Sequence, residues 1–259
     1  MVLKEGIRCR RRAKLAERHF LPILRRALKT GHLIALEGID GTGKGTQARL
    51  LAEALRRRGV RVRPFSFPAY RETLAGSLIG TYLNGGLGDP RTIDSRLTAV
   101  LYAIDRFELR GQMLEALSAG ETVICDRYVG SNMAHQVARA APRNRPAVRS
   151  LIESLEFGVL GLPRPELVIF FDMPVSLAQG RVLKKDVRQY TRRKLDANEA
   201  DARHLKCALA EYRFQARSDP GWLRVPTVSG RRERTREEIH EDVLAAAWEL
   251  VGNGEALRF

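Results

Sequence analysis

The chain has 259 residues, 44% of them hydrophobic, which is enough to bury the core of one α/β domain; single cores usually stop growing near about 250–300 residues. No stretch approaches the ~18 consecutive apolar residues of a membrane span, so we expect no membrane partner. The formal net charge is +15, but residues 1–32 hold ten Lys and Arg against two Glu. The charge of the rest is too diffuse to require nucleic acid.

Residues 1–30 are predicted to be a basic N-terminal extension of a domain that covers residues 31–259. Arginine runs flank a weak helical stripe of apolar residues in this extension. A solvated, dispensable helix is the favoured interpretation, and an Arg-rich targeting segment stays open as the alternative.

The three cysteines, Cys9, Cys125 and Cys207, lie far apart in the sequence. They form no CxxC pair and have no zinc-binding spacing. We therefore expect free thiols in a cytoplasmic protein.

Short apolar runs alternate with helical patterns from Leu33 onward. The runs are typical of buried parallel strands, and the patterns between them repeat apolar residues at helical spacing. The predicted strands cover residues 33–37, 60–67, 122–125, 167–171 and 222–228, and the predicted helices cover residues 47–58, 74–84, 93–118 and 236–251.

A glycine-rich turn joins the first predicted strand to the first predicted helix. This context favours a phosphate-binding loop, because backbone N–H groups can turn inward around a phosphate and the helix start adds partial positive charge. We call residues 38–46 the phosphate loop. Its predicted phosphate-binding residues are Gly38, Gly41, Thr42, Gly43, Lys44, Gly45 and Thr46.

The alternation of strands and helices around this loop predicts an α/β fold. We expect the three-layer P-loop NTPase fold, with a parallel five-stranded sheet, helices on both faces and a mobile lid. Ligands bind beyond the carboxyl ends of the strands in such sheets. Asp40, Asp126 and Asp172 follow predicted strands, so we expect the site at that edge.

The phosphate loop departs from the usual pattern after its lysine, where Ser or Thr commonly binds Mg²⁺. Gly45 stands there and the hydroxyl comes one residue later, at Thr46. One residue on a helix rotates the side chain by about 100°, so Thr46 does not simply take over that role. Magnesium would be held by other groups or through water.

Two acidic residues and one arginine are expected beside the phosphate loop. Asp40 is costly near phosphates unless it faces a hydroxyl, a cation or an arginine. We favour a sugar hydroxyl, with metal contact as a second role and an exposed turn as the alternative. Asp126 is predicted to hold hydrated Mg²⁺, and Arg127 to fork onto phosphate oxygens.

Two further segments are candidates for substrate contact. Tyr102 and Arg106 are four residues apart on a predicted helix and so lie on the same face. An aromatic ring that stacks on a base and a guanidinium that contacts its carbonyl would together recognise a nucleotide base. Core packing is the alternative for Tyr102. The charge-dense segment of about 181–199 is either a mobile lid that brings arginine onto the transferring phosphoryl group or a solvated loop.

These pieces together resemble the thymidylate kinase family, from about Leu33 to Val251. The resemblance rests on several motifs in the family's order: residues 37–44 (EGIDGTGK), 67–71 (FPAYR), 82–85 (YLNG), 102–108 (YAIDRFE), 126–129 (DRYV), 131–132 (SN), 155–157 (LEF), 163–166 (PRPE) and 196–199 (DANE).

The resemblance implies transfer of the ATP γ-phosphoryl group to dTMP with Mg²⁺, and a homodimer. Lys44 and the loop amides would hold ATP, and Asp40 would contact the sugar 3′-hydroxyl. The remaining acceptor contacts implied by the family's motifs are Tyr102 stacked on thymine, Arg106 on its carbonyl, Asn132 lining the base site, Pro68 beside the thymine methyl and Arg127 on the acceptor phosphate.

Three departures from the family's pattern redirect the assignments. His135 stands where an aromatic residue near the sugar is common, and it is either a polar residue of the pocket wall or a residue that discriminates between sugars. Tyr70 and Arg71 compete to grip the acceptor phosphate. Gly41 stands where some members carry a catalytic arginine, so that charge is expected from the lid, with Arg181 the best match and Lys185 next.

Other functions remain as alternatives. One is a phosphate-loop kinase for another nucleotide or nucleoside. A second is a nucleic-acid-binding ATPase that uses the basic extension, and a third is an inactive relative that lacks the loop hydroxyl. Nucleic acid is the less favoured partner because the charge outside the extension is diffuse.

Overall fold

The structure is a computed structural model that describes residues 31–90, 92–183, 201–230 and 232–252. The extension 1–30 and residues 184–199 of the predicted lid, Lys185 among them, lie outside the described residues. Within the described ranges, no helix is both long and apolar enough to cross a membrane.

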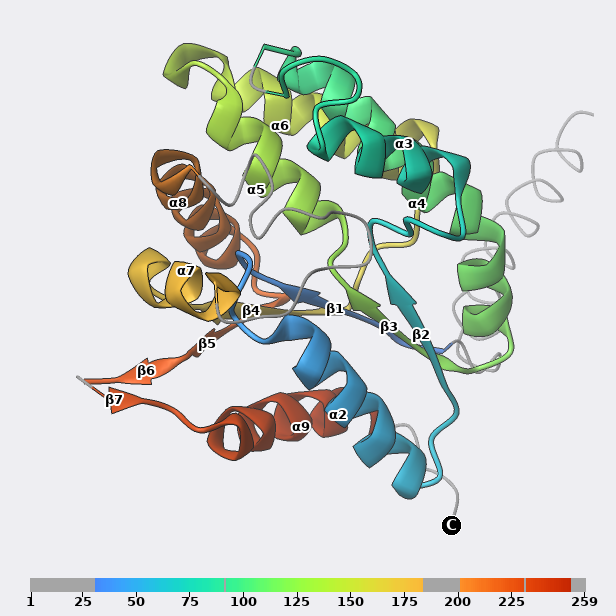
Figure 1. Cartoon of the computed structure of the whole chain (residues 1–259). Coiled ribbons are helices and arrows are strands. Elements are labelled where there is room, and N and C mark those ends of the chain that lie inside the picture. Colours follow the sequence, from blue (N-terminus) through green and yellow to red (C-terminus); the bar gives the residue numbers. More distant parts are fainter. Residues whose placement is uncertain (1–30, 91, 184–200, 231, 253–259) are drawn as a thin grey trace, which may run out of the picture.

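One five-stranded parallel sheet forms the centre of the molecule (Figure 1), in the order β2-β3-β1-β4-β5. The central pairing places Leu36 of β1 opposite Asp126 of β3, so both strands end at the same edge. A small antiparallel pair, β6 and β7, follows β5. The strands are β1 (Leu33–Glu37), β2 (Val62–Ser66), β3 (Thr122–Asp126), β4 (Leu167–Asp172), β5 (Trp222–Pro226), β6 (Val228–Ser229) and β7 (Arg232–Glu233).

Helices cover both faces of this sheet (Figure 1), with α2 and α9 on one face and α4, α5 and α8 on the other. The helices are α2 (Lys44–Arg57), α3 (Leu74–Leu83), α4 (Ser95–Ser118), α5 (Val129–Arg139), α6 (Arg145–Glu153), α7 (Val175–Leu183), α8 (Ala202–Ser218) and α9 (Arg236–Gly252), with a 3₁₀ turn η1 (Pro142–Asn144) and a π-helical turn η2 (Ser154–Val159).

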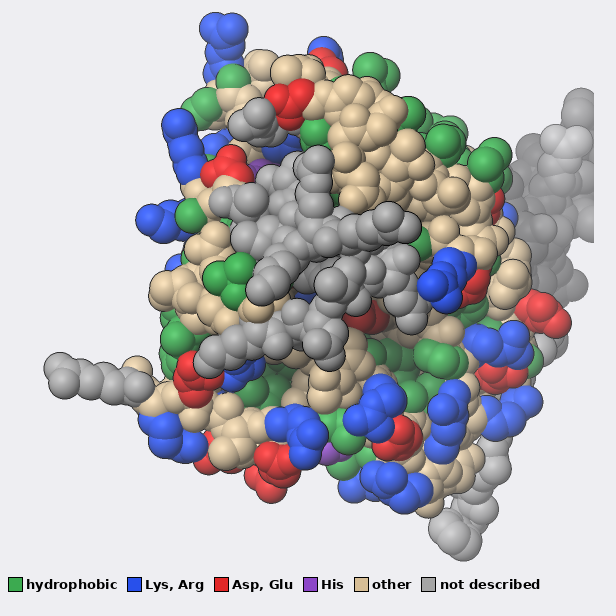
Figure 2. Space-filling model, viewed as in Figure 1, with side chains coloured by type: hydrophobic (Ala, Val, Ile, Leu, Met, Phe, Trp, Pro, Cys, Tyr) green, Lys and Arg blue, Asp and Glu red, His purple; other side chains and the backbone are tan. Residues whose placement is uncertain are grey.

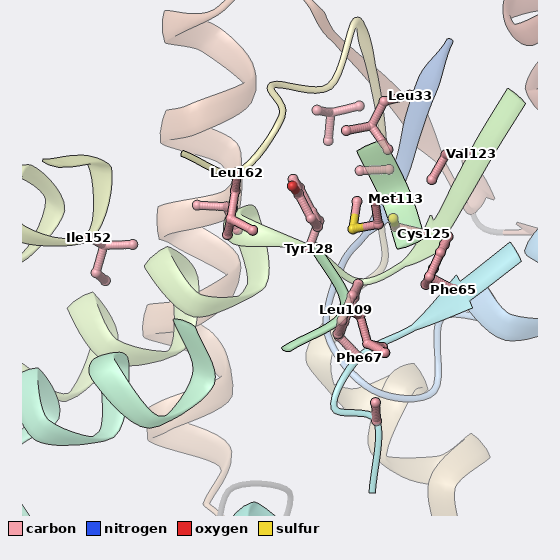
Figure 3. Close-up of a cluster of buried hydrophobic side chains, with 14 of the residues drawn as sticks. Leu33, Phe65, Phe67, Leu109, Met113, Val123, Cys125, Tyr128, Ile152 and Leu162 are labelled. Carbon is pink, nitrogen blue, oxygen red and sulfur yellow. The ribbon is translucent and has the colours of Figure 1, made fainter. Parts of the chain in front are cut away.

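A separate apolar cluster fills each side of the sheet. Between the sheet and α2 and α9, strand residues such as Ile34 and Ile169 pack against helix residues. On the other face (Figure 3), Leu33, Val123 and Cys125 pack against Met113 and Leu109 of α4. Cys125 is buried with a free thiol, and burial raises its pKa far above the usual range.

The α/β fold and the five parallel strands agree with the prediction, but several element bounds differ. Helix α2 begins at Lys44 rather than residue 47, because the turn of the phosphate loop sets its start, not the first apolar residue. The last strand ends at Pro226 instead of residue 228, and Val228 belongs to the β6–β7 pair. Helices α5, α6 and α8 were not predicted.

Candidate active site

The phosphate loop follows β1 and turns on glycines with left-handed backbone. Gly41 and Gly43 have φ of 85° and 92°, a region that L residues seldom adopt. A Cβ at Gly41 would lie 2.2 Å from the carbonyl oxygen of Ala178 in α7. Helix α7 therefore leaves no room for a side chain at position 41, which explains why no arginine stands there.

Lys44 is the first residue of α2 and lies almost fully buried within the loop. Its Nζ donates to the carbonyl oxygen of Ile39 at 2.7 Å. Burial, and next the positive charge of Arg127, lower the pKa of Lys44 to about 8. This ammonium lies at the N-terminus of a helix, where the first N–H groups have no partner within the helix, and both features suit anion binding.

Asp126, the last residue of β3, lies directly against Gly45. A Cβ at Gly45 would come within 2.9 Å of the Asp126 Oδ2 atom. The other carboxylate oxygen, Oδ1, is buried without a hydrogen-bond partner. An orphaned carboxylate oxygen beside a phosphate loop fits a hydrated Mg²⁺. Within the described ranges, no three His, Cys, Asp or Glu side chains converge on a metal site.

Arg127 joins the ends of the two central strands. Its Nη2 group forms an ion pair with Asp40 Oδ1 at 2.7 Å, and Nη1 donates to the carbonyl oxygen of Gly38 at 3.1 Å. The residue has φ of 68°, a left-handed conformation that is unusual without glycine. Asp40 thus faces an arginine, one of the three kinds of partner that offset the cost of a carboxylate beside phosphates.

A pocket opens at this edge of the sheet, and we call it the acceptor pocket. Eight of the nine residues predicted to bind the acceptor line it; the exception is Arg71, which is exposed. The lining residues are Asp40, Ser66, Phe67, Pro68, Tyr70, Leu83, Tyr102, Arg106, Asp126, Arg127, Ser131, Asn132, His135 and Gln136.

Arg106 and Asn132 share one buried glutamate on the pocket wall. Arg106 donates from Nε and Nη2 to Glu156, each at 2.6 Å, and Asn132 donates from Nδ2 to the same carboxylate at 2.7 Å. The Oδ1 atom of Asn132 is buried without a partner. That orphaned acceptor can receive a hydrogen bond from an N–H group of a ligand.

His135, another lining residue, is paired with a second histidine. Its Nδ1 lies 3.0 Å from Nε2 of His204 in α8. Burial lowers the pKa of both imidazoles, that of His204 to about 4. Both rings are therefore neutral near pH 7.

The chain matches the model of the thymidylate kinase family over residues 36–218. It belongs to the thymidylate kinase family. A probable thymidylate kinase of Pyrococcus horikoshii is 35% identical over 226 residues, 86% of this chain and 98% of the relative. A thymidylate kinase of Bordetella petrii is 33% identical over 84% of this chain and 97% of its own length. A thymidylate kinase of Mycobacterium tuberculosis is 33% identical over 149 residues, which are 58% of this chain and 69% of the relative.

Arg181, predicted to be the catalytic arginine of this family member, is not among the residues that line the acceptor pocket. It belongs to α7, and its Nη2 pairs with Glu233 of β7 at 2.5 Å. Its catalytic role stays a prediction.

Several residues that shape the site had no predicted role. Asp105 accepts hydrogen bonds from the Ala69 N–H at 3.2 Å and from the Thr73 hydroxyl, and so holds the turn that carries Pro68 and Tyr70. Glu156 belonged to a motif of the resemblance but was assigned no contact. Partners as distant as Arg106 and Glu156 leave no local signal in the sequence.

Proposed function

We propose that this chain transfers the γ-phosphoryl group of ATP to dTMP and releases dTDP and ADP. The observation that carries the proposal is the acceptor pocket. Eight residues predicted to bind dTMP line one cavity beside the phosphate loop, although they come from segments that lie far apart in the sequence. Membership of the thymidylate kinase family supports the same substrate pair.

The base and sugar would be recognised by the pocket walls. Tyr102 would stack on thymine, with Pro68 beside its methyl group. The unpartnered Oδ1 of Asn132 would accept the thymine N3–H, and Arg106, held in place by Glu156, would approach a base carbonyl. Asp40 would receive the sugar hydroxyl, and the neutral His135 would lie near the sugar.

The transfer step demands little covalent chemistry from the protein. An oxygen of the acceptor phosphate attacks the γ-phosphorus, the bond from that phosphorus to the bridging oxygen breaks, and ADP leaves. The nucleophile is already an anion, so no strong general base is required. Lys44 and Arg127 would align the two phosphates and neutralise charge, and Arg181 or Lys185 would add charge at the transferring group.

Magnesium is part of this proposal. When bound, Mg²⁺ neutralises charge on the ATP phosphates. Asp126 would hold it through water, because one of its oxygens is buried without a partner and Gly45 leaves space in front of the other. Asp40 is the weaker candidate, since its carboxylate already pairs with Arg127.

A coupled assay of ADP release tests the function. We expect turnover with dTMP to exceed that with dUMP, UMP and AMP, and the Lys44→Ala variant to lose activity by at least 100-fold. Equal or faster turnover of another acceptor would overturn the dTMP assignment. ATP hydrolysis that requires added DNA or RNA and disappears on deletion of residues 1–30 would favour the nucleic-acid-dependent ATPase instead.

A homodimer through α3 and α4 is also proposed. Leu97, Ile104 and Phe107 repeat at helical spacing along α4 and are 68%, 41% and 45% exposed, and Leu74 of α3 is 72% exposed. Figure 2 shows hydrophobic side chains along the rim of the molecule where these helices lie. Apolar stripes of this kind are typical of interfaces between subunits.

We assign the protein to the cytoplasm. The buried thiol of Cys125 and the partly exposed thiol of Cys207 are both free, which suits a reducing compartment. Cell fractionation tests this assignment, and recovery with organelles would favour the targeting interpretation of residues 1–30.

A further inference from the structure

Glu37, the last residue of β1, is a fully buried carboxylate that the proposed chemistry does not use. Its Oε1 accepts hydrogen bonds from the backbone N–H groups of Tyr128 at 2.9 Å and Ser131 at 3.0 Å. Its Oε2 lies 2.5 Å from the hydroxyl of Ser131. Buried carboxylates are costly, so this one is expected to have a specific task.

The hydroxyl of Ser131 connects Glu37 to Arg127. Its Oγ lies 2.5 Å from Glu37, 2.8 Å from the hydroxyl of Tyr212 in α8 and 3.1 Å from Nη1 of Arg127. A serine hydroxyl donates one hydrogen bond and accepts two. Burial raises the pKa of Glu37, but the groups that face it are all donors: two backbone N–H groups, the Ser131 hydroxyl and, at 3.4 Å, the Tyr212 hydroxyl. Glu37 therefore accepts from Ser131, whose own acceptor positions stay open to Arg127 and Tyr212.

We infer that Glu37 is a positioning residue for Arg127. By accepting the hydrogen bond from the Ser131 hydroxyl, Glu37 turns the lone pairs of that hydroxyl toward the guanidinium. The guanidinium is then held at the acceptor pocket between Ser131, Gly38 and Asp40. The inference rests on the proposed function at one point, the contact between Arg127 and the acceptor phosphate.

The backbone around Arg127 depends on the same carboxylate. Arg127 has a left-handed φ of 68°, and the next N–H group, that of Tyr128, is bound by Glu37. A Cβ at Gly130 would lie 2.9 Å from Glu37 Oε1 and 2.8 Å from the Trp222 ring. The glycine therefore leaves the space that the carboxylate occupies beneath the start of α5.

Glu37→Gln tests the inference with almost no change in shape. The amide that replaces one oxygen carries two N–H groups. Facing Ser131, it donates to the hydroxyl instead of accepting from it, so Ser131 must turn its own proton toward Tyr212 and no longer presents the same lone pairs to Arg127. In the opposite orientation, the NH₂ of the introduced amide faces the backbone N–H groups of Tyr128 and Ser131, and both of their hydrogen bonds are lost. We expect the affinity for dTMP to fall at least tenfold.

Thymidine separates this effect from a general loss of structure, because it has the base and sugar of dTMP without the phosphate. In Glu37→Gln we expect the Kd of thymidine and of ATP, measured by calorimetry, to stay within twofold of wild type. Arg127→Gln removes the guanidinium itself, so it should lower dTMP affinity by at least as much as Glu37→Gln does. The ratio of the two Kd values, dTMP to thymidine, is the decisive readout.

Two further variants complete the design. Ser131→Ala removes only the connecting hydroxyl and should reproduce the altered ratio, and Glu37→Gln added to it should have little further effect. It also replaces Glu37→Gln as the test should that variant fail to fold. Glu211→Gln changes another buried glutamate, paired with Arg149 outside the pocket, and should lower the Tm but keep the wild-type ratio.

A wild-type ratio in both Glu37→Gln and Ser131→Ala, with a changed ratio in Arg127→Gln, would overturn the inference alone. Equal losses of dTMP and thymidine affinity in Glu37→Gln would also overturn it, as a general disturbance of the pocket. A wild-type ratio in Arg127→Gln would overturn it together with the phosphate contact proposed for Arg127. None of these results touches the activity assay, which tests the proposed function separately.

Discussion

Lys44 lies in a site that makes its charge sensitive to pH. Burial lowers its pKa from 10.5 to about 8, so the free enzyme carries the ammonium below that pH and loses it above. We predict that the Kd for ATP rises through pH 8 and approaches a tenfold increase per pH unit beyond it. Equilibrium titrations between pH 7 and 9.5 check this, and the Lys44→Ala variant should show weak binding without the same rise.

Gly45 is predicted to support Mg²⁺ binding, because the absence of a side chain leaves space for the Asp126 carboxylate. An alanine methyl at position 45 would come within 2.9 Å of Asp126 Oδ2 and push the carboxylate aside. We expect Gly45→Ala to raise the Mg²⁺ concentration for half-maximal activity several-fold. Gly180→Ala is the matched control, since a methyl there meets nothing within 4 Å. Identical Mg²⁺ dependence in both variants would argue against Asp126 as the metal-holding residue.

At the residue scale, local motifs predicted much of the pocket. Asp40, Arg127 and Asn132 follow strand ends or sit in short motifs, and all three line the acceptor pocket. Glu37 and Glu156 received no role, because Ser131 lies 94 residues from Glu37 and Arg106 lies 50 residues from Glu156 in the sequence. The approach of a backbone carbonyl from a neighbouring helix is equally invisible, as the closeness of the Ala178 carbonyl to Gly41 illustrates.

At the scale of helices and strands, prediction succeeded for the sheet and for α2, α3, α4 and α9 but missed α5, α6 and α8. Buried parallel strands are short apolar runs and stand out. Helix α8 was not predicted because polar and charged residues interrupt its apolar face. Glu211 and Gln215 are buried on that face beside Leu205 and Tyr212. The buried polar side chains have partners in the folded protein, but a periodicity analysis reads them as exposed.

The η2 turn is tied to α4 by the buried pair of Arg106 and Glu156. Their side chains are 2% and 0% exposed. Glu156→Ala would leave a buried guanidinium without its partner, and we expect it to lower the free energy of unfolding by about 3–5 kcal/mol. Urea denaturation measures the change. Glu153→Ala, which breaks the exposed pair with Arg164, should cost less than about 1 kcal/mol; similar losses in the two variants would contradict this account.

At the scale of the whole molecule, the exposed face of α3 and α4 predicts self-association. Phe107→Glu places a charge in the apolar stripe of α4 and should convert a dimer to a monomer without changing the Tm of the monomer by more than a few degrees. Sedimentation velocity gives the mass of each variant. Leu183→Glu, at an exposed position of α7, should remain dimeric. A monomeric wild-type protein would refute the dimer.

The pairing of β1 with β3 also affects how the protein opens. The phosphate loop and Arg127 follow these two central strands, so a nucleotide that contacts both holds together the least accessible part of the sheet. Amide hydrogens of β1 should exchange with solvent only when the whole domain unfolds. Ligand at 100 times its Kd adds about 2.7 kcal/mol to that opening, which slows exchange about 100-fold. Exchange at the C-terminal turn of α9, which frays locally, should not respond, and this contrast would map the cooperative unit that the substrate stabilises.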